Sequence, residues 1–281
     1  MLTDTHCHLD LDRFDGDREA VIQRAQDAEV ERILVPGLDL ESSVAAIKLA
    51  ERCELVFAAV GVHPNDAGAW EENTLEEIRS LAGHQKVVAI GEIGLDYYWD
   101  RHPRDLQQSI FRRQLGIAGE LGLPVVVHNR ESDDDVVEML LAWQAELARA
   151  GNPLAGRPGV LHSFSAGLAH AHRAIAANFH IGITGPITFK NAPELRALVK
   201  ELPLVQLLVE TDSPFLSPHP FRGQRNEPAR VRLVAEAIAE VKNLDLEEVV
   251  RQTGLNADRL FGWGNKKTPR DGGVSGAIEG T

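Results

Sequence analysis

The stretch MLTDTHCHLDLDRF, residues 1–14, begins with a run typical of a strand and continues as a polar segment without glycine. An open, doubly wound sheet that binds a nucleotide carries a glycine-rich phosphate turn directly after its first strand. Because residues 8–14 contain no such turn, the stretch argues against a doubly wound sheet. His6 and His8 lie at the end of the expected strand, two positions apart.

Short β-rich runs alternate with longer helical patterns through the rest of the chain, which is typical of a parallel sheet with helical crossovers. The expected strands are residues 1–7, 31–37, 54–62, 86–93, 123–129, 159–164, 179–184 and 205–211. The expected helices include residues 17–30, 41–53, 105–122, 133–150, 192–202, 228–241 and 246–254.

Eight strands, each followed by helix or loop, predict an α/β fold of the (β/α)8 TIM-barrel type. Such barrels commonly use about 250 residues as one domain, which fits a chain of 281 residues. We expect a single barrel domain over residues 1–262. The tail, residues 263–281, is glycine-rich and lacks apolar periodicity, so we expect it to be disordered.

The composition is that of an ordinary globular protein, with 43% hydrophobic and 25% charged residues. The two cysteines, Cys7 and Cys53, suggest no disulfide framework. No apolar run approaches the roughly 20 residues that span a bilayer, and the start of the chain lacks the basic and apolar regions of a signal peptide. We therefore expect a cytoplasmic protein without a membrane partner.

The net charge of −13 argues against a broad basic face, which proteins that bind nucleic acids usually carry. Metal ions in a site can neutralise phosphate locally, since they are often the largest charges there. The net charge therefore does not exclude a nucleic-acid substrate.

Polar residues end six of the eight expected strands, and the carboxyl ends of parallel strands meet at one rim of a barrel. In strand order these residues are His6 and His8, His63, Glu92, His128, His162 and Asp212. Each has a structural alternative, because a lone histidine at a strand end is commonly a hydrogen-bonded structural residue and Asp212 can cap a helical turn. Their convergence on one rim favours a metal site.

The remaining histidines do not share this pattern, and we expect surface or structural roles for them. They are His84, His102, His170, His172, His180 and His219.

His6 and His8 face the same side of a strand, because residues i and i+2 point the same way. Cys7 then faces the helices and is expected to be a small apolar filler. Imidazoles combined with carboxylates suit zinc, manganese or iron better than calcium or magnesium alone. Four histidines and two carboxylates exceed what one catalytic metal with an open position needs, whereas two metals about 3.5–4 Å apart would use all six.

Seven motifs occur in an order that resembles the TatD family of metal-dependent deoxyribonucleases, within the amidohydrolase-like barrels, as far as about Phe261. The motifs are DTHCHLD, GVHP, GEIGLDYY, PVVVHNR, LHSFS, LLVETDSPFL and RNEP. The resemblance implies a TIM barrel with two divalent metal ions, such as zinc, manganese or magnesium. It further implies hydrolysis of phosphodiester bonds in DNA, with single strands or frayed ends as substrate.

The resemblance also implies roles for the rim residues. His6, His8 and Asp212 would bind one metal, and His128 and His162 the other. Glu92 would bridge the two metals, and His63 would face the substrate phosphate.

A mechanism follows as a hypothesis, in which a metal-activated hydroxide attacks phosphorus. The expected catalytic residues are Asp212 as general base, Glu92 between the metals, and His63 as donor to the phosphate or to the leaving group. Arg130 is expected to clamp a phosphate oxygen with its forked donors.

Further substrate contacts are expected on the neighbouring loops. Tyr97, Tyr98 and Trp99 follow Glu92 closely and could stack a base, with packing under the loop as the alternative for at least one of them. Lys190 and Arg225 are weaker candidates for phosphate contacts, and for both of them and for Arg130 a solvated surface charge is an equal alternative.

Two other functions stay open. The same centre could cleave an amide or ester, as a D-aminoacyl-tRNA deacylase does, but amidohydrolases often bridge their metals with a carboxylated lysine and none occurs near Glu92. A metal-storage barrel would close its sites with protein ligands, whereas six ligands across two metals leave open positions. A monomer is the preferred oligomeric state.

Overall fold

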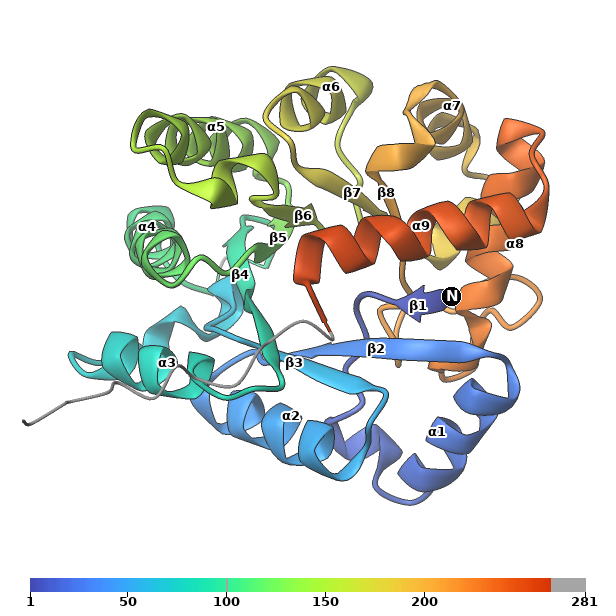
Figure 1. The fold of residues 1–281 in the computed structure, drawn as a ribbon, viewed down its shortest axis with the longest axis horizontal. Coiled ribbons are helices and arrows are strands. Elements are labelled where there is room, and N and C mark those ends of the chain that lie inside the picture. Colours follow the sequence, from blue (N-terminus) through green and yellow to red (C-terminus); the bar gives the residue numbers. More distant parts are fainter. Residues whose placement is uncertain (100, 264–281) are drawn as a thin grey trace, which may run out of the picture.

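The computed structural model describes residues 1–99 and 101–263, and its eight strands alternate with helices along the chain (Figure 1). The strands are β1 Leu2–Asp4, β2 Val30–Pro36, β3 Val56–Val60, β4 Val87–Asp96, β5 Val125–Arg130, β6 Gly159–Leu161, β7 His180–Ile183 and β8 Leu207–Val209. The helices are α1 Arg18–Asp27, α2 Leu40–Arg52, α3 Thr74–Ala82, α4 Arg104–Leu121, α5 Asp133–Arg149, α6 Leu168–Ala176, α7 Pro193–Glu201, α8 Val231–Lys242 and α9 Leu246–Phe261.

Six short 3₁₀ turns lie in the connections of the described chain. They are η1 Asp12–Phe14, η2 Pro64–Ala69, η3 Pro153–Gly156, η4 Gly185–Thr188, η5 Leu204–Gln206 and η6 Pro228–Arg230.

The strands form one parallel sheet in the order β1 to β8, so each strand pairs with the next along the chain. Backbone hydrogen bonds also join the two edges of this sheet: Thr5 N–H donates to the Val209 carbonyl (3.2 Å) and Asp212 N–H to the His6 carbonyl (2.8 Å). The sheet therefore curls into a nearly closed barrel, and the predicted (β/α)8 fold is confirmed. Its closure brings the segment after β1 against the segment after β8.

Alternate residues of the strands face two different cores, as the two-residue repeat of a strand requires. In β2, Ile33 and Val35 belong to the large core between the sheet and the surrounding helices. Leu34, between them, belongs to a smaller core inside the barrel. Cys7 is buried in the helix-side core, where an apolar filler was expected.

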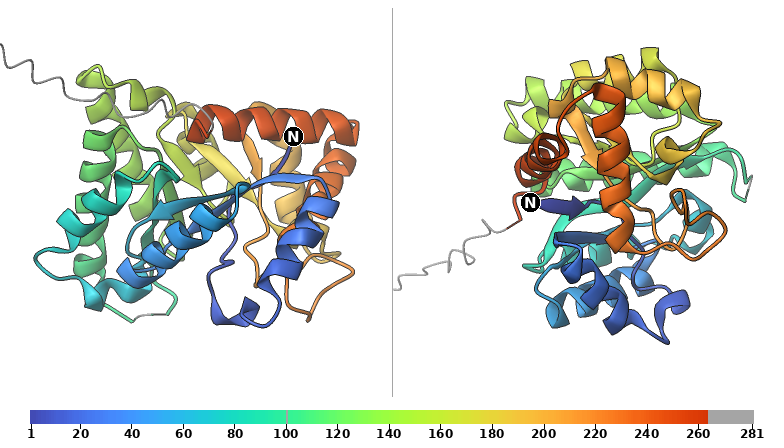
Figure 2. Two further views of the ribbon diagram at one scale, coloured as in Figure 1. Left: turned by 60° about the horizontal axis from the view of Figure 1, so that its bottom comes forward. Right: turned by 90° about the vertical axis from the view of Figure 1, so that its right-hand side faces the viewer.

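The end of α9 closes the amino end of the barrel. Leu260, Phe261 and Trp263 belong to the inner core, and the Trp263 ring packs 5.3 Å from that of Phe57, near the start of β3. In Figure 2 (left), α9 lies at the top and the loops that follow β1 and β8 lie at the bottom. Trp263, the first residue of the expected tail, is therefore buried; residues 264–281 lie outside the described residues.

Seven helices were predicted close to their observed positions, and two were not. The two unpredicted helices are α3 and α6, each nine residues long. The last helix was predicted to Gly254 but continues to Phe261. Position 254, inside this helix, accommodates glycine because a Cβ there would collide with the carbonyl oxygen of Met1.

Within residues 1–99 and 101–263, no helix has both the length and the apolar character that crossing a bilayer requires.

Candidate metal centre

The seven side chains expected at the rim do meet there, at the carboxyl ends of their strands. Six of the eight strands supply them, and β2 and β7 supply none. The residues are His6 and His8 after β1, His63 after β3, Glu92 in β4, His128 in β5, His162 after β6 and Asp212 after β8.

Glu92 lies at the middle of this group, with its side chain 3% exposed. Its Oε2 atom is 3.2 Å from His6 Nε2 and 3.6 Å from His8 Nε2. Its Oε1 atom is 2.9 Å from both His128 Nδ1 and His162 Nε2. The two oxygens of one carboxylate therefore face two different pairs of imidazoles.

Each pair is itself tightly spaced. The Nε2 atoms of His6 and His8 are 3.2 Å apart, and Asp212 Oδ1 lies 3.7 Å from the first and 3.5 Å from the second. His162 Nε2 lies 3.4 Å from His128 Nδ1. In each pair the facing ring nitrogens therefore lie close enough together to bind one ion.

These distances suit divalent metal ions. Ligands about 2.0–2.1 Å from a tetrahedral zinc lie about 3.3 Å from one another, close to the spacings in both pairs. Within residues 1–99 and 101–263, three overlapping triads have ligand atoms within 4.8 Å of one another: His6, His8 and Asp212; His6, Glu92 and His162; and His63, Glu92 and His128. The donor set, imidazole with carboxylate, fits a transition metal.

Protonation of the centre in the absence of metal follows from burial and close charges. Burial alone would lower the pKa of His8, but the hydrogen bond to Asp212 and the charge of Glu92 outweigh it and raise that pKa to about 9. Burial lowers the pKa of His6 to about 4, helped by the charge of His162. The pKa of Glu92 lies well below its usual value, because the charges of His162 and His6 overcome the effect of its burial. The carboxylates are thus held ionised and ready for cations.

Asp96 is a site residue that the sequence interpretation missed. Its Oδ2 atom is 3.1 Å from His128 Nε2, on the ring side opposite the nitrogen that faces Glu92. Burial would raise the Asp96 pKa, but the hydrogen bonds with His128 and the Trp99 N–H lower it to about 2. A sequence signal existed, since Asp96 and Glu92 are four residues apart in β4 and therefore share a face.

Gly94 allows β4 to lie close to β5 between these two carboxylates. Its φ of 146° is in the region that favours glycine. A Cβ there would collide with the carbonyl oxygen of His128. A side chain at position 94 would therefore push β4 away from the backbone of His128 in β5.

His63 has a different hydrogen-bond arrangement from the other histidines at the rim. Its Nδ1 atom accepts a hydrogen bond from the backbone N–H of Asn65 at 3.0 Å. Burial lowers its pKa to about 3, so the ring is neutral at pH 7. A neutral imidazole that accepts at Nδ1 carries its proton at Nε2, and that atom lies 3.6 Å from Glu92 Oε1.

Two buried acids support the loops beneath the centre. Asp4 accepts hydrogen bonds from the Thr211 hydroxyl at 2.6 Å and the Thr211 N–H at 2.9 Å, and burial raises its pKa to about 8. Glu210 accepts from the N–H of Ser163, and burial raises its pKa to about 7. The contacts of both acids therefore suit them to hold these loops in place.

The loop after β4 carries an exposed group of aromatic rings beside the centre. The Arg130 guanidinium lies 4.1 Å from the Tyr98 ring centroid and 5.5 Å from that of Trp99. Tyr98 is 48% and Trp99 53% exposed. Tyr97 is packed instead, because its hydroxyl donates to Asp135 at 2.6 Å and Arg104 covers its ring at 4.1 Å.

Arg225 and Lys190, the two weaker candidates for phosphate contacts, differ in their surroundings. Arg225 forms a forked pair with Asp17, at 2.7 and 2.8 Å, and donates to the carbonyl of Arg13 at 2.7 Å. It therefore ties the loop after β8 to the loop after β1. Lys190 is exposed.

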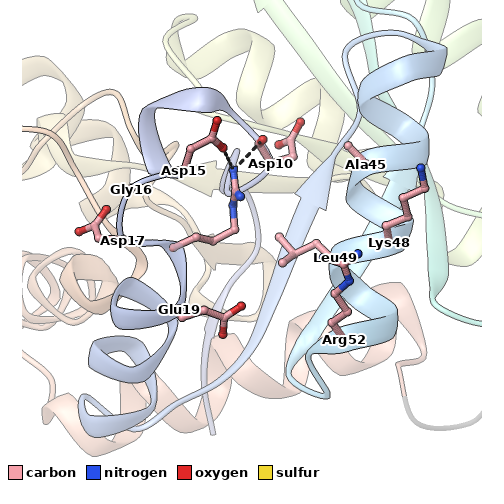
Figure 3. Close-up of a pocket in the computed structure, with 10 residues that line it drawn as sticks. Asp10, Asp15, Gly16, Asp17, Glu19, Ala45, Lys48, Leu49 and Arg52 are labelled. Carbon is pink, nitrogen blue, oxygen red and sulfur yellow. Dashed lines mark hydrogen bonds and ion pairs between the residues drawn. The ribbon is translucent and has the colours of Figure 1, made fainter.

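A separate pocket of about 400 Å³ lies between α1 and α2 (Figure 3). Acidic and basic side chains both line it, including Asp10 and Lys48, while Arg18 donates to Asp15 at 2.7 Å and to the carbonyls of Leu9 and Asp10. None of the rim residues that meet at Glu92 lines this pocket. Asp10 is thus placed at its edge and not among the ligands of the candidate centre.

Comparison with known proteins places this geometry in a family. The family model described as TatD related DNase matches residues 3–262. The metal-dependent hydrolase YabD of Bacillus subtilis is 45% identical over 93% of this chain and 99% of its own. The 3'-5' ssDNA/RNA exonuclease TatD of Erwinia amylovora is 35% identical over 92% of this chain and 99% of its own.

The crystal structure of YjjV, a TatD homologue from Escherichia coli, superposes with a TM-score of 0.84 at 34% identity, covering 93% of this chain and 98% of that chain. The barrel, the convergent histidines and carboxylates, and the matches over nearly the whole chain agree: the protein is a metal-dependent hydrolase and belongs to the TatD-related DNase family.

Proposed function

We propose that the centre holds two divalent metal ions and hydrolyses phosphodiester bonds at single-stranded or frayed ends of DNA. The observation that carries this proposal is the placement of Glu92, whose Oε2 faces His6 at 3.2 Å while its Oε1 faces His162 at 2.9 Å. A carboxylate in this position suits a bridge between two cations. The name of the Erwinia relative, a 3'-5' ssDNA/RNA exonuclease, supports the substrate class.

The ligands divide into two sets that share Glu92. His6, His8 and Asp212 form one set, and His128 and His162 form the other. Divalent metals bound there supply two things: they lower the pKa of water to about 7 and they offset the charge of the phosphate. Zinc, manganese and magnesium are the candidate ions.

Asp212 accepts the proton from the attacking water. Its pKa is lowered despite burial, through the hydrogen bond with His8 and the charge of His6, so it is ionised at neutral pH. Its side chain is 14% exposed, against 3% for Glu92. It is therefore the more open of the two carboxylates to water entering from the barrel mouth.

His63 donates its Nε2–H to an oxygen of the scissile phosphate, or to the leaving oxygen. The acceptor role of its Nδ1 toward Asn65 fixes which nitrogen carries the proton. A buried neutral donor stabilises the charge that develops on the phosphate in the transition state.

The loop after β4 holds the DNA beside the metals. Arg130 clamps a phosphate oxygen, and Tyr98 and Trp99 stack an unpaired base, as aromatic rings do in proteins that bind single strands. Tyr97 was also expected to contact substrate, but its contacts with Asp135 and Arg104 suit it to hold this loop in place.

The test uses protein freed of metal by chelation and reloaded with Mn²⁺, Zn²⁺ or Mg²⁺. End-labelled single-stranded DNA, a blunt duplex and a D-aminoacyl-tRNA are supplied in parallel. We expect metal-dependent cleavage of the single strand, slower cleavage of the blunt duplex, and loss of both with Glu92→Gln. Glu146→Gln, an exposed acid on α5, is the matched control and should keep full activity.

Full activity in excess chelator would remove the metal role. Hydrolysis of the aminoacyl ester with the DNA left intact would instead assign the same centre to a deacylase.

A further inference from the structure

Phe215 is a large apolar residue left 42% exposed beside the candidate centre. Its ring centroid lies 6.3 Å from that of His8, with the two planes at 70°. Its backbone N–H donates to the carbonyl of Asp212 at 2.8 Å. The ring therefore has a defined position relative to His8 and Asp212. None of the roles proposed above involves Phe215.

A cation accompanies this ring. The guanidinium of Arg13, in η1, lies 5.3 Å from the Phe215 ring centroid. Arg13 is exposed, and within residues 1–99 and 101–263 its side chain has no ion pair within 4 Å.

The loops that carry this pair are braced against each other. The Arg13 carbonyl accepts from Arg225, which also pairs with Asp17 and covers the buried Phe14 ring at 4.7 Å. Figure 2 shows the two loops side by side at the mouth of the barrel, following β1 and β8. The positions of Arg13 and Phe215 are therefore fixed by packing and ion pairing beneath them.

The same combination of arginine and exposed aromatic ring occurs across the barrel. There Arg130 covers Tyr98 at 4.1 Å, at the ends of β4 and β5. Because β4 and β8 lie four strands apart in the sheet, the candidate metal ligands lie between the two combinations. A chain that passes over the metals thus meets a ring and a guanidinium on each side.

We propose that Phe215 and Arg13 form a second nucleotide-binding position, in which the ring stacks the base of one nucleotide flanking the scissile bond and the guanidinium contacts that nucleotide's phosphate. The ligand class is an unpaired nucleotide, because only a base outside a duplex exposes its face to a protein ring. The proposal rests on the phosphodiesterase function proposed above. It explains a preference for single strands, since the bases on both sides of the cleaved bond must be unpaired.

The test pairs one enzyme variant with one substrate change. The substrates are a single-stranded oligonucleotide and two copies with a tetrahydrofuran abasic residue on one or the other side of the cleaved bond. For wild-type protein, one abasic substrate should lose about 5- to 150-fold in kcat/KM. Phe215→Ala should show the same loss on the normal substrate and no further loss on that abasic one, while Phe215→Tyr, which keeps a ring, restores the wild-type pattern.

Two further variants separate binding from structure. Val205→Ala, an exposed apolar residue far from the rim, should change nothing. Arg13→Gln should weaken DNA binding and lower the slope of log K against log salt by about 0.7, the value for one phosphate contact on a single strand.

Equal loss of activity on all three substrates in Phe215→Ala would show a structural role and overturn the proposal, as would unchanged kinetics. Wild-type protein that cleaves no DNA would overturn the proposed function and this position together. Cleavage that does not depend on Phe215 overturns this position alone.

Discussion

His6 and His162 stack face to face, with ring centroids 3.9 Å apart and planes inclined by 12°. They follow β1 and β6, and their Nε2 atoms lie near different oxygens of Glu92, at 3.2 and 2.9 Å. The two stacked rings therefore lie where the two candidate ligand sets meet.

Removing one metal ligand should abolish metal binding only at the ligand set to which that residue belongs. We expect His162→Ala to reduce the metal content of reloaded protein from two ions per chain to one, because His6, His8 and Asp212 remain. Elemental analysis after gel filtration measures this content. The control His180→Ala alters a buried histidine outside the centre and should retain two. Loss of both ions in His162→Ala would mean that the sets do not bind separately.

Asp96 should act on metal affinity through His128. Asp96→Asn removes the charge that faces His128 Nε2 at 3.1 Å, and loss of such a partner typically weakens metal affinity about 10- to 100-fold. Competition with a coloured chelator measures the affinity. Asp134→Asn is the control, because Asp134 pairs with His170 on the surface at 2.9 Å. Equal affinity in the two variants would contradict the role of Asp96.

Substitutions of Trp99 and Tyr97 should distinguish a ring that stacks a base from a ring that packs beneath the loop. Trp99→Ala removes an exposed ring, and we expect KM for single-stranded DNA to rise about 5- to 150-fold. Tyr97→Phe removes only a hydroxyl that donates to Asp135 and should leave KM nearly unchanged. Steady-state kinetics at fixed salt decides the matter, and a larger effect of Tyr97→Phe would reverse the assignment.

His180 should make the fold sensitive to acid. Burial, with the charge of Arg259, lowers its pKa to about 4 from 6.5. Between these values the unfolded chain binds a proton that the folded protein does not, so the free energy of unfolding falls as pH drops below 6.5. From pH 7 to pH 5 this group contributes a loss of about 2 kcal/mol.

His180→Gln removes that contribution. Urea unfolding at pH 7 and pH 5 should therefore show a smaller pH dependence in the variant, by about 2 kcal/mol. An identical pH dependence in the two proteins would mean that His180 is protonated in the folded state at pH 5.

Much of this architecture was predictable because strands and site share one signal. Apolar β-rich runs predicted all eight strands, and in six of them a histidine or carboxylate near the end of the run also marked the rim residues. The helices α3 and α6, each nine residues long, were not predicted, although α7 has the same length and was.

Contacts between residues of different strands and loops could not be derived from the local sequence pattern. Asp96 follows Glu92 by four residues, but its partner His128 becomes apparent only once β4 and β5 pair with Gly94 opposite His128. The pairing of Arg13 with Phe215 likewise depends on barrel closure, which brings the segment after β1 to the segment after β8. The partners lie 32 positions apart in the first contact and about two hundred in the second, separations over which periodicity carries no information.

We propose that Glu92 bridges two metal ions. The most direct test is anomalous diffraction from crystals of the protein loaded with Mn²⁺ or Zn²⁺, recorded at the absorption edge of that metal. We expect two peaks about 3.5–4 Å apart, one beside His6, His8 and Asp212 and the other beside His128 and His162, with one oxygen of Glu92 facing each. A single peak, or a second peak out of reach of Glu92, would contradict it.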